Sequence, residues 1–263
     1  MLRWRNSSRH MRSNYLTPAI VLRNRPFGES DKIVSFLTEN FGKLTGIAKG
    51  ALRSRKRFVN SLEPFALVNL RFQDPPHSNL AFIVAADLVS SFRLLTSLER
   101  IFYACYLVEI TDGLIGEREE NRAVFEHLRA GLIYLEDNET SLRFLTAFEL
   151  KLLRLVGYQP FLDNCKKCHK ERRDGPVRWH FSPIDGGILC ESCARQRKEV
   201  LPLGAAAVDV LTALQAEPND LPSRISLPPS VIREIRAVVL RFIQFHMDRE
   251  IQSAAFLAPF SSV

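Results

Sequence analysis

The sequence predicts an α+β protein of more than one domain, with an N-terminal β-barrel followed by an α-helical domain that contains a four-cysteine module. Three observations support this class. Five short apolar runs separated by turn residues occupy residues 17–92, a helical period follows, and two Cys-x-x-Cys pairs interrupt that period. With 263 residues, the chain has room for one large domain or for two to three small ones.

The first predicted domain, residues 17–92, has the pattern of five short strands. Turns such as Pro26-Phe27-Gly28 and Asn40-Phe41-Gly42 separate strands that are expected at residues 18–23, 32–38, 43–50, 65–72 and 80–86. Five short strands in roughly 75 residues are typical of a small closed barrel. The OB-fold is the five-stranded barrel that commonly binds nucleic acid, although an SH3-like barrel would give much the same pattern.

Helical spacing replaces the strand pattern after Ser91. Apolar residues recur at intervals of three and four, which predicts helices at residues 94–108, 121–135, 141–156, 205–214 and 231–249. Gly157 is suited to end the third helix, and Cys105 lies on an apolar face as a buried core residue. Residues 93–162 and 199–263 therefore form a helical domain that buries its own core.

Residues 163–198 carry the cysteine pairs of the predicted module. Two cysteines three positions apart on a tight turn direct both sulfurs to one metal, so two such pairs supply the four thiolates of a tetrahedral zinc site. The four ligands are expected to be Cys165, Cys168, Cys190 and Cys193. Such a site has no open position, so one structural Zn²⁺ per chain is expected.

Two alternatives to zinc share the same four thiols. An iron–sulfur cluster also takes four cysteines, but the two-by-two spacing favours zinc. Paired disulfides are disfavoured because the chain has no secretory features. His169 and His180 lie nearby in the sequence, but a complete set of four cysteines leaves them as bystanders.

Positive charge is concentrated at the N-terminal end. The net charge is +7, yet residues 1–57 hold 13 Lys and Arg against 3 Asp and Glu, so this stretch carries +10 and the rest carries −3. Such an asymmetry predicts a polyanionic partner, most simply nucleic acid, and the alternative is a solvated basic surface. The candidate DNA-contacting residues are Arg23, Lys43, Lys49, Arg53, Arg55, Lys56, Arg57 and Arg71.

Two further features of this end have alternative interpretations. Phe27, Phe41 and Phe58 are candidates for base stacking, but each is more simply barrel core. Residues 1–16 predict a flexible basic extension; a transit peptide or a true start at Met11 would give the same composition.

Catalytic motifs are absent from the sequence. There is no GxxxxGK[ST], HExxH or GxSxG pattern, and the acidic run at residues 117–120 predicts a solvated helical face. We therefore expect a protein that is not an enzyme. No run of eighteen apolar residues occurs, so no membrane span is expected.

Several segments together resemble the RecO family. The resemblance rests on Gly28-Glu29-Ser30-Asp31-Lys32 with Phe36-Leu37-Thr38, on Gly42-Lys43-Leu44, on Ala48-Lys49-Gly50-Ala51, and on Leu62-Glu63-Pro64-Phe65. It continues in Phe148-Glu149-Leu150-Lys151 followed by Gly157-Tyr158-Gln159-Pro160, just before the cysteine module, and covers about residues 17–250.

The resemblance implies a DNA repair and recombination mediator. RecO-like proteins bind single- and double-stranded DNA, anneal complementary strands, and with RecR assist RecA loading onto DNA coated with single-strand binding protein. They also dock the acidic C-terminal tail of that binding protein. A cytoplasmic, nucleoid-associated location follows. Lys151 and Arg154 are candidates for holding such a tail, and a plain amphipathic helix face is the alternative.

Two other classes compete with this interpretation. A zinc-ribbon transcription or translation factor that binds RNA or protein would share the cysteine module and the basic end. A nucleic-acid enzyme whose acidic residues come together only in three dimensions would show metal-dependent cleavage.

Overall fold

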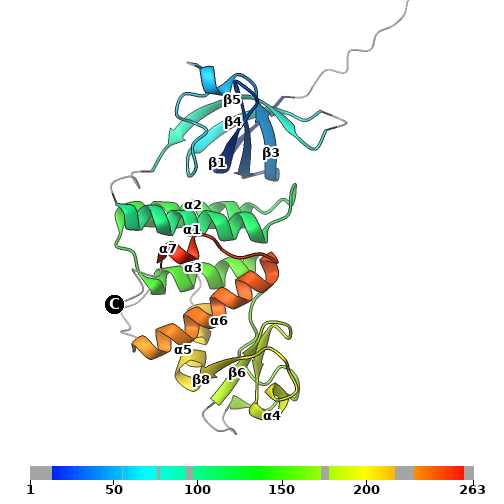
Figure 1. The fold of residues 1–263 in the computed structure, drawn as a ribbon, viewed down its shortest axis with the longest axis vertical. Coiled ribbons are helices and arrows are strands. Elements are labelled where there is room, and N and C mark those ends of the chain that lie inside the picture. Colours follow the sequence, from blue (N-terminus) through cyan, green and yellow to red (C-terminus); the bar gives the residue numbers. More distant parts are fainter. Residues whose placement is uncertain are drawn as a thin grey trace, which may run out of the picture. The chain divides into compact units, whose positions relative to one another are not determined.

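The computed structural model describes residues 14–54, 56–75, 78–92, 97–172, 178–216 and 228–257 (Figure 1). The chain forms two compact units. The first comprises Met1–Ser91 with Glu117–Arg122, and the second comprises Phe92–Gly116 with Ala123–Val263. Most of the predicted basic extension at 1–16 lies outside the described residues. The predicted domain boundaries within the second unit stay a prediction.

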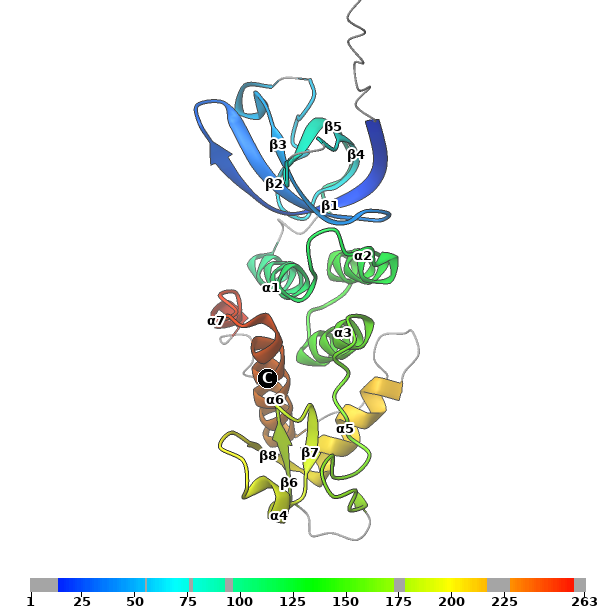
Figure 2. The ribbon, with the colours of Figure 1, turned by 90° about the vertical axis from the view of Figure 1, so that its right-hand side faces the viewer.

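The first unit contains a closed five-stranded barrel. Its strands are β1 (Asn14–Phe27), β2 (Asp31–Thr38), β3 (Gly42–Ala48), β4 (Leu67–Gln73) and β5 (Ala81–Ser90). They close in the order β1-β2-β3-β5-β4, in which β3 and β5 pair in parallel and the other neighbours are antiparallel (Figure 2). This is the OB-fold order, so the predicted N-terminal fold is confirmed.

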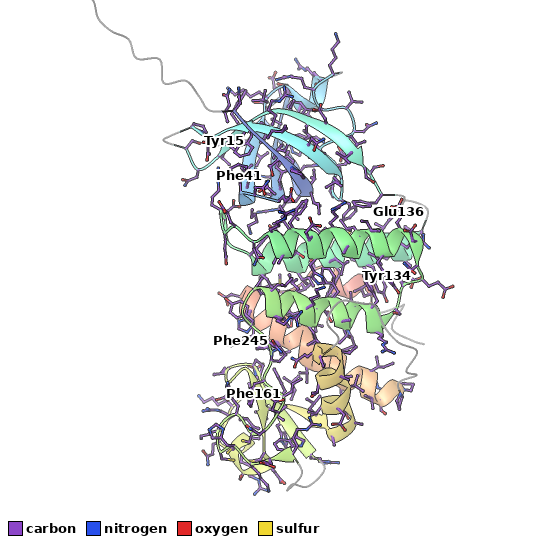
Figure 3. The ribbon with its side chains drawn as sticks, turned by 180° about the vertical axis from the view of Figure 1, so that it is seen from behind. Tyr15, Phe41, Tyr134, Glu136, Phe161 and Phe245 are labelled. Carbon is purple, nitrogen blue, oxygen red and sulfur yellow. The ribbon has the colours of Figure 1, made fainter. Side chains whose placement is uncertain are left out.

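Alternating side chains build the barrel core. In β4, Val68, Leu70 and Phe72 are buried while Asn69 and Arg71 between them are exposed, as a strand with one covered face requires. Tyr15 and Phe41 lie together against this core (Figure 3), with their ring centroids 5.2 Å apart. The alternation of apolar and polar residues therefore sets which side of each strand is available to a ligand.

The second unit is mainly helical. It contains α1 (Leu98–Leu114), α2 (Arg122–Asp137), α3 (Leu142–Leu155), α5 (Ala205–Ala216) and α6 (Pro229–Met247), with the short helices α4 (Glu191–Ala194) and α7 (Ala254–Leu257). Ser97 and Ser141 accept hydrogen bonds from the backbone amides of the first turns of α1 and α3, which stabilises both helix starts. The predicted helices are confirmed, except that the expected beginning near Leu94 and the loop at 221–227 lie outside the described residues.

Close packing of the helices depends on a glycine. A side chain at Gly131 of α2 would come within 2.7 Å of Phe148 of α3 and 3.1 Å of Leu107 of α1. Such distances are shorter than carbon–carbon contact, so only glycine lets α2 pack against both neighbours. Among the described helices, none has the length and apolar character needed to cross a membrane.

A small sheet accompanies the helices in this unit. The strands β6 (Arg178–Ser182), β7 (Gly187–Leu189) and β8 (Leu201–Gly204) pair in the order β7-β6-β8. The helical period correctly begins a helix at residue 205 but gives no sign of the strand before it, whose residues pair with β6 before α5 begins. A four-residue strand has no period long enough to identify, and only its partner strand defines it.

A buried polar group joins three helices of the second unit. The Glu149 carboxylate on α3 accepts hydrogen bonds from the Tyr106 hydroxyl on α1 and from the Arg236 guanidinium on α6. Glu149 is fully buried, and the Arg236 side chain is 17% exposed. Buried charges require such pairing, so this triad fixes how α1, α3 and α6 face one another.

Candidate metal centre and nucleic-acid interface

The four cysteines of the two pairs come together in one cluster. The sulfurs of Cys165, Cys168, Cys190 and Cys193 all lie within 4.8 Å of one another, and the Cys168 and Cys190 sulfurs are 3.6 Å apart. A disulfide would need about 2.05 Å between sulfurs, whereas four sulfurs about 2.3 Å from a tetrahedral ion are separated by about 3.8 Å. The geometry therefore fits a metal ion and not paired disulfides.

Local backbone structure positions both pairs. In the first turn, the His169 amide donates to the Cys165 carbonyl at 2.8 Å, and His169 has a φ of 60°. The second pair flanks the first turn of α4, which Cys190 precedes. The Cys190 amide donates to the Cys165 sulfur at 3.4 Å, which links the two turns directly.

The environment of the thiols favours metal binding. Burial raises the pKa of Cys190, but hydrogen bonds from Ser192 and from the Cys193 amide outweigh it and bring the pKa to about 6. Burial and hydrogen bonds to Cys190 and Cys168 raise the pKa of Cys193 to about 12. Four thiolates repel one another unless a cation lies between them, so the raised pKa of Cys193 fits the metal-free cluster, and the four sulfurs could together hold a metal ion. Its closed set of four ligands leaves no position for a substrate.

Exposed basic residues gather at one end of the barrel. The β1–β2 turn contacts the segment after β3, because the Leu52 amide donates to the Ser30 carbonyl and the Gly50 amide to the Asp31 carboxylate. The Arg57 guanidinium donates to the Lys49 carbonyl at 2.9 Å. We call this region the basic end; its predicted DNA-contacting residues are Lys49, Arg53, Lys56 and Arg57, all exposed.

The other predicted DNA-contacting residues have different settings. Lys43 on β3 is only 8% exposed. Arg23 pairs with Ser35, midway along β2. Arg71 on β4 is exposed, and its neighbour Leu70 pairs with Ala86, whose amide donates to the Arg57 carbonyl at 3.2 Å. Arg55 lies outside the described residues. The basic end therefore brings together four of the eight predicted residues, and whether they contact DNA stays a prediction.

Lys43 is covered by an acidic segment, residues 117–120, which we call the acidic strap. Glu117 forms a parallel bridge with Lys43 and accepts a hydrogen bond from Thr45 at 2.8 Å. A side chain at Gly42, which has a φ of 64°, would come within 2.2 Å of the Glu119 carbonyl. The strap is exposed but is not helical, so the expected helical face is wrong: its backbone pairs with the edge of β3, where the Arg118 amide donates to the Lys43 carbonyl at 2.8 Å.

Two ion pairs anchor the strap region. Arg118 donates two hydrogen bonds to Asp74, at 2.7 and 3.0 Å, and Arg122 pairs with Glu39 at 2.8 Å. Three strap carboxylates thus lie along the part of β3 farthest from the basic end. Negative charge there repels phosphates, so a phosphate backbone is expected at the basic end and not beside the strap.

Comparisons with known proteins agree with this architecture. The family models described as recombination protein O N terminal and C terminal match residues 11–92 and 95–255. The DNA repair protein RecO of Syntrophus aciditrophicus is 35% identical over 249 residues, which cover 94% of this chain and 96% of that protein. The chain belongs to the RecO family. The RecO protein of Myxococcus xanthus is 32% identical over 245 residues, covering 93% of this chain and 97% of the relative. Membership supports a role in DNA repair or recombination.

Sequence reasoning missed two features of this RecO-family chain. Arg25 is exposed at the basic end, two residues beyond Arg23 and two before Phe27. The period of two along β1 would have placed all three on one side of the strand. Phe27 is 47% exposed and remains available for base stacking, whereas Phe58 is 5% exposed in the core. The acidic strap had no local signal, because its contacts with β3 join residues more than 70 positions apart.

Proposed function

We propose that this RecO-family chain binds single- and double-stranded DNA through the basic end of the barrel and anneals complementary strands. The observation that carries the proposal is the convergence of four exposed cations, Lys49, Arg53, Lys56 and Arg57, at one end of an OB-fold barrel. Lysines and arginines that neutralise phosphates give binding with little dependence on base sequence. Holding two strands by their backbones lowers their mutual repulsion, so pairing nuclei form faster.

The proposed role makes and breaks no covalent bond. With a RecR-like partner, the chain assists RecA loading onto DNA that is coated with single-strand binding protein. The cysteine cluster holds one structural zinc ion in this proposal, because four thiolates at tetrahedral spacing are the donor set that zinc favours. The metal stabilises the fold of residues 163–198 and takes no part in annealing.

The acidic tail of single-strand binding protein has a candidate site on α3. Lys151 and Arg154 lie near His127 of α2, whose pKa is lowered to about 4 by burial and, to a smaller degree, by these two cations. Clustered positive charge beside the apolar packing of α2 and α3 suits a peptide that is both acidic and hydrophobic. We propose that this surface receives the tail.

The proposed function is tested by annealing of two complementary oligonucleotides, one of them coated with single-strand binding protein, over a salt series without nucleotide. Four phosphate contacts on a single strand give a slope of about −3 in log K against log[salt], so affinity falls about 50-fold between 50 and 200 mM salt. Annealing is expected to decline in parallel.

Charge reversal separates the basic end from general positive charge. Lys56→Glu is expected to slow annealing and reduce the salt slope, whereas Arg233→Glu on α6, also exposed, changes the net charge equally and leaves both unchanged. Annealing that is independent of salt contradicts the electrostatic mechanism. Preference for structured RNA over single-stranded DNA would favour a zinc-ribbon RNA-binding factor instead.

A further inference from the structure

A second cationic surface lies beside the metal centre in the other unit. A hollow of about 540 Å³ opens there, and its walls include Lys170, Arg178, Trp179, Cys190, Glu191 and Arg195. Pockets of roughly 300–1,000 Å³ accommodate small molecules, so a nucleotide fits this volume. We call this space the basic hollow.

The cations of the basic hollow are only partly neutralised. Arg195 pairs with Glu191 at 2.6 Å, so one of three cations is matched by the one carboxylate. In the part of the chain that the structure describes, neither Lys170 nor Arg178 forms an ion pair. Lys167 adds a further cation at the rim, where it donates to Gln196 at 2.6 Å. Three cations in the walls face two anions, the Glu191 carboxylate and the Cys190 thiolate, so the hollow keeps a net positive charge.

The neighbouring hollow has the opposite character. Trp179, which is 3% exposed, contributes to the walls of both. On the other side of this ring lie Asp163, Glu171 and Asp209, where Arg172 pairs with Asp209. Positive and negative side chains are thus separated across Trp179 and do not neutralise one another. Such separation leaves an attractive field for an anion on one side only.

We propose that the basic hollow is a second nucleic-acid site, which takes the backbone phosphates of a single strand. Arg178 and Arg195 present planar guanidinium groups that match phosphate geometry, and Lys170 adds a compact point charge. The inference rests on the proposed annealing function and deepens it: a protein that pairs two strands benefits from holding each at its own site.

The metal centre offers a competing reason for these cations. Four thiolates around a divalent ion carry a charge of −2, which nearby lysines and arginines would stabilise. The two explanations differ in what they predict. Cations that serve the metal centre control metal retention, whereas cations that bind phosphate control the salt dependence of DNA binding.

The test uses the full-length, metal-loaded chain in which Lys49, Arg53 and Lys56 at the basic end are all replaced by Gln. Anisotropy of an eight-nucleotide single strand is measured over a salt series. Residual binding is expected, and Lys170→Gln with Arg178→Gln in this background should reduce the magnitude of the salt slope by about 1.4, which corresponds to two phosphate contacts. Arg233→Gln, which removes an exposed charge elsewhere, is the control and should leave the slope unchanged.

Four results would overturn the inference, and they separate it from the proposed function. If the unsubstituted chain binds but the basic-end variant does not, the second site is absent and the proposed function stands. If the unsubstituted chain binds no DNA, both fail. An unchanged slope with weaker zinc retention assigns the cations to the metal centre. Binding of an acidic peptide to this hollow without any change in oligonucleotide binding identifies a protein-docking surface instead.

Discussion

The buried triad of Tyr106, Glu149 and Arg236 allows a quantitative test of how the helical unit is held together. The proposed perturbation is Glu149→Leu, which keeps the approximate side-chain volume but removes the shared acceptor. Burial alone would lower the pKa of Arg236, but the Glu149 carboxylate raises it above its ordinary value. Without Glu149, Arg236 keeps its charge in a buried place with no counter-charge.

The expected loss follows from the two contacts. Leaving a buried charge without its partner costs about 3–5 kcal/mol, and the 17% exposure of the Arg236 side chain favours the lower end. A buried Tyr106 hydroxyl without an acceptor adds about 1 kcal/mol. The total of about 4 kcal/mol corresponds to a decrease in Tm of about 8–16 °C for a unit of this size.

The assay is thermal unfolding of the metal-loaded protein followed by circular dichroism. The matched variant combines Glu149→Leu with Arg236→Met and replaces the ion pair by apolar side chains. It should recover about 3 of the 4 kcal/mol, because only the Tyr106 hydroxyl stays unpaired. Equal losses in the single and double variants, or a loss below about 1 kcal/mol in the single variant, would refute the argument.

The remaining predictions concern the metal, the acidic strap and pH. Cys193→Ser, or zinc removal by a chelator, should lower the thermal stability of the second unit by several kcal/mol, because residues 163–198 have little core of their own. The barrel should stay folded. Differential scanning calorimetry with circular dichroism measures the unfolding of both units. Glu117→Gln should raise the affinity for single-stranded DNA about twofold at low salt, because a charge about 10 Å from a phosphate contributes about 0.4 kcal/mol in water; anisotropy titration measures it. Burial lowers the pKa of His127 from 6.5 to about 4, so the folded state favours the neutral ring. The contribution of this preference to the free energy of unfolding is fully present above pH 6.5. It decreases by about 3 kcal/mol as the pH falls towards 4, and urea unfolding across this pH range measures the decrease.

Each of these predictions has a control. Metal removal that leaves the unfolding transition unchanged would show that the cysteines do not stabilise the fold. Glu250→Gln, at an exposed position in the second unit, should leave DNA affinity unchanged, and an equal effect of both substitutions would assign the gain to net charge alone. His127→Phe should flatten the stability profile between pH 6.5 and 4, and an unchanged profile would mean that another group titrates there.

Much of the fold was predictable because its signals are local. Alternating apolar residues and glycine-containing turns gave the five strands, and the helical period gave the helices with errors of a few residues at their ends. The exceptions are the short strands β6, β7 and β8 and the short helices α4 and α7, which the sequence pattern did not predict. The identity of β8, for example, depends on pairing with β6, which is 20 residues or more away.

The candidate metal centre and the predicted DNA-contacting surface also differ in whether their sequence signal is local. A Cys-x-x-Cys pair is its own geometric unit, so the spacing predicted a cluster that the structure confirms. The DNA-contacting residues were chosen from charge along the sequence, which carries no information on burial. Lys43 has the same charge as Lys49, yet the acidic strap covers it and leaves Lys49 exposed.

The sequence by itself determined the barrel, the helices, the four clustered cysteines and the basic N-terminal end. Each of these depends on residue spacing within one segment or on summed charge. Only the tertiary structure decided that the strap pairs with the edge of β3, that Lys43 is covered, and that Glu149 joins three helices. Such contacts join distant segments, and their energies depend on burial and packing that no local pattern encodes.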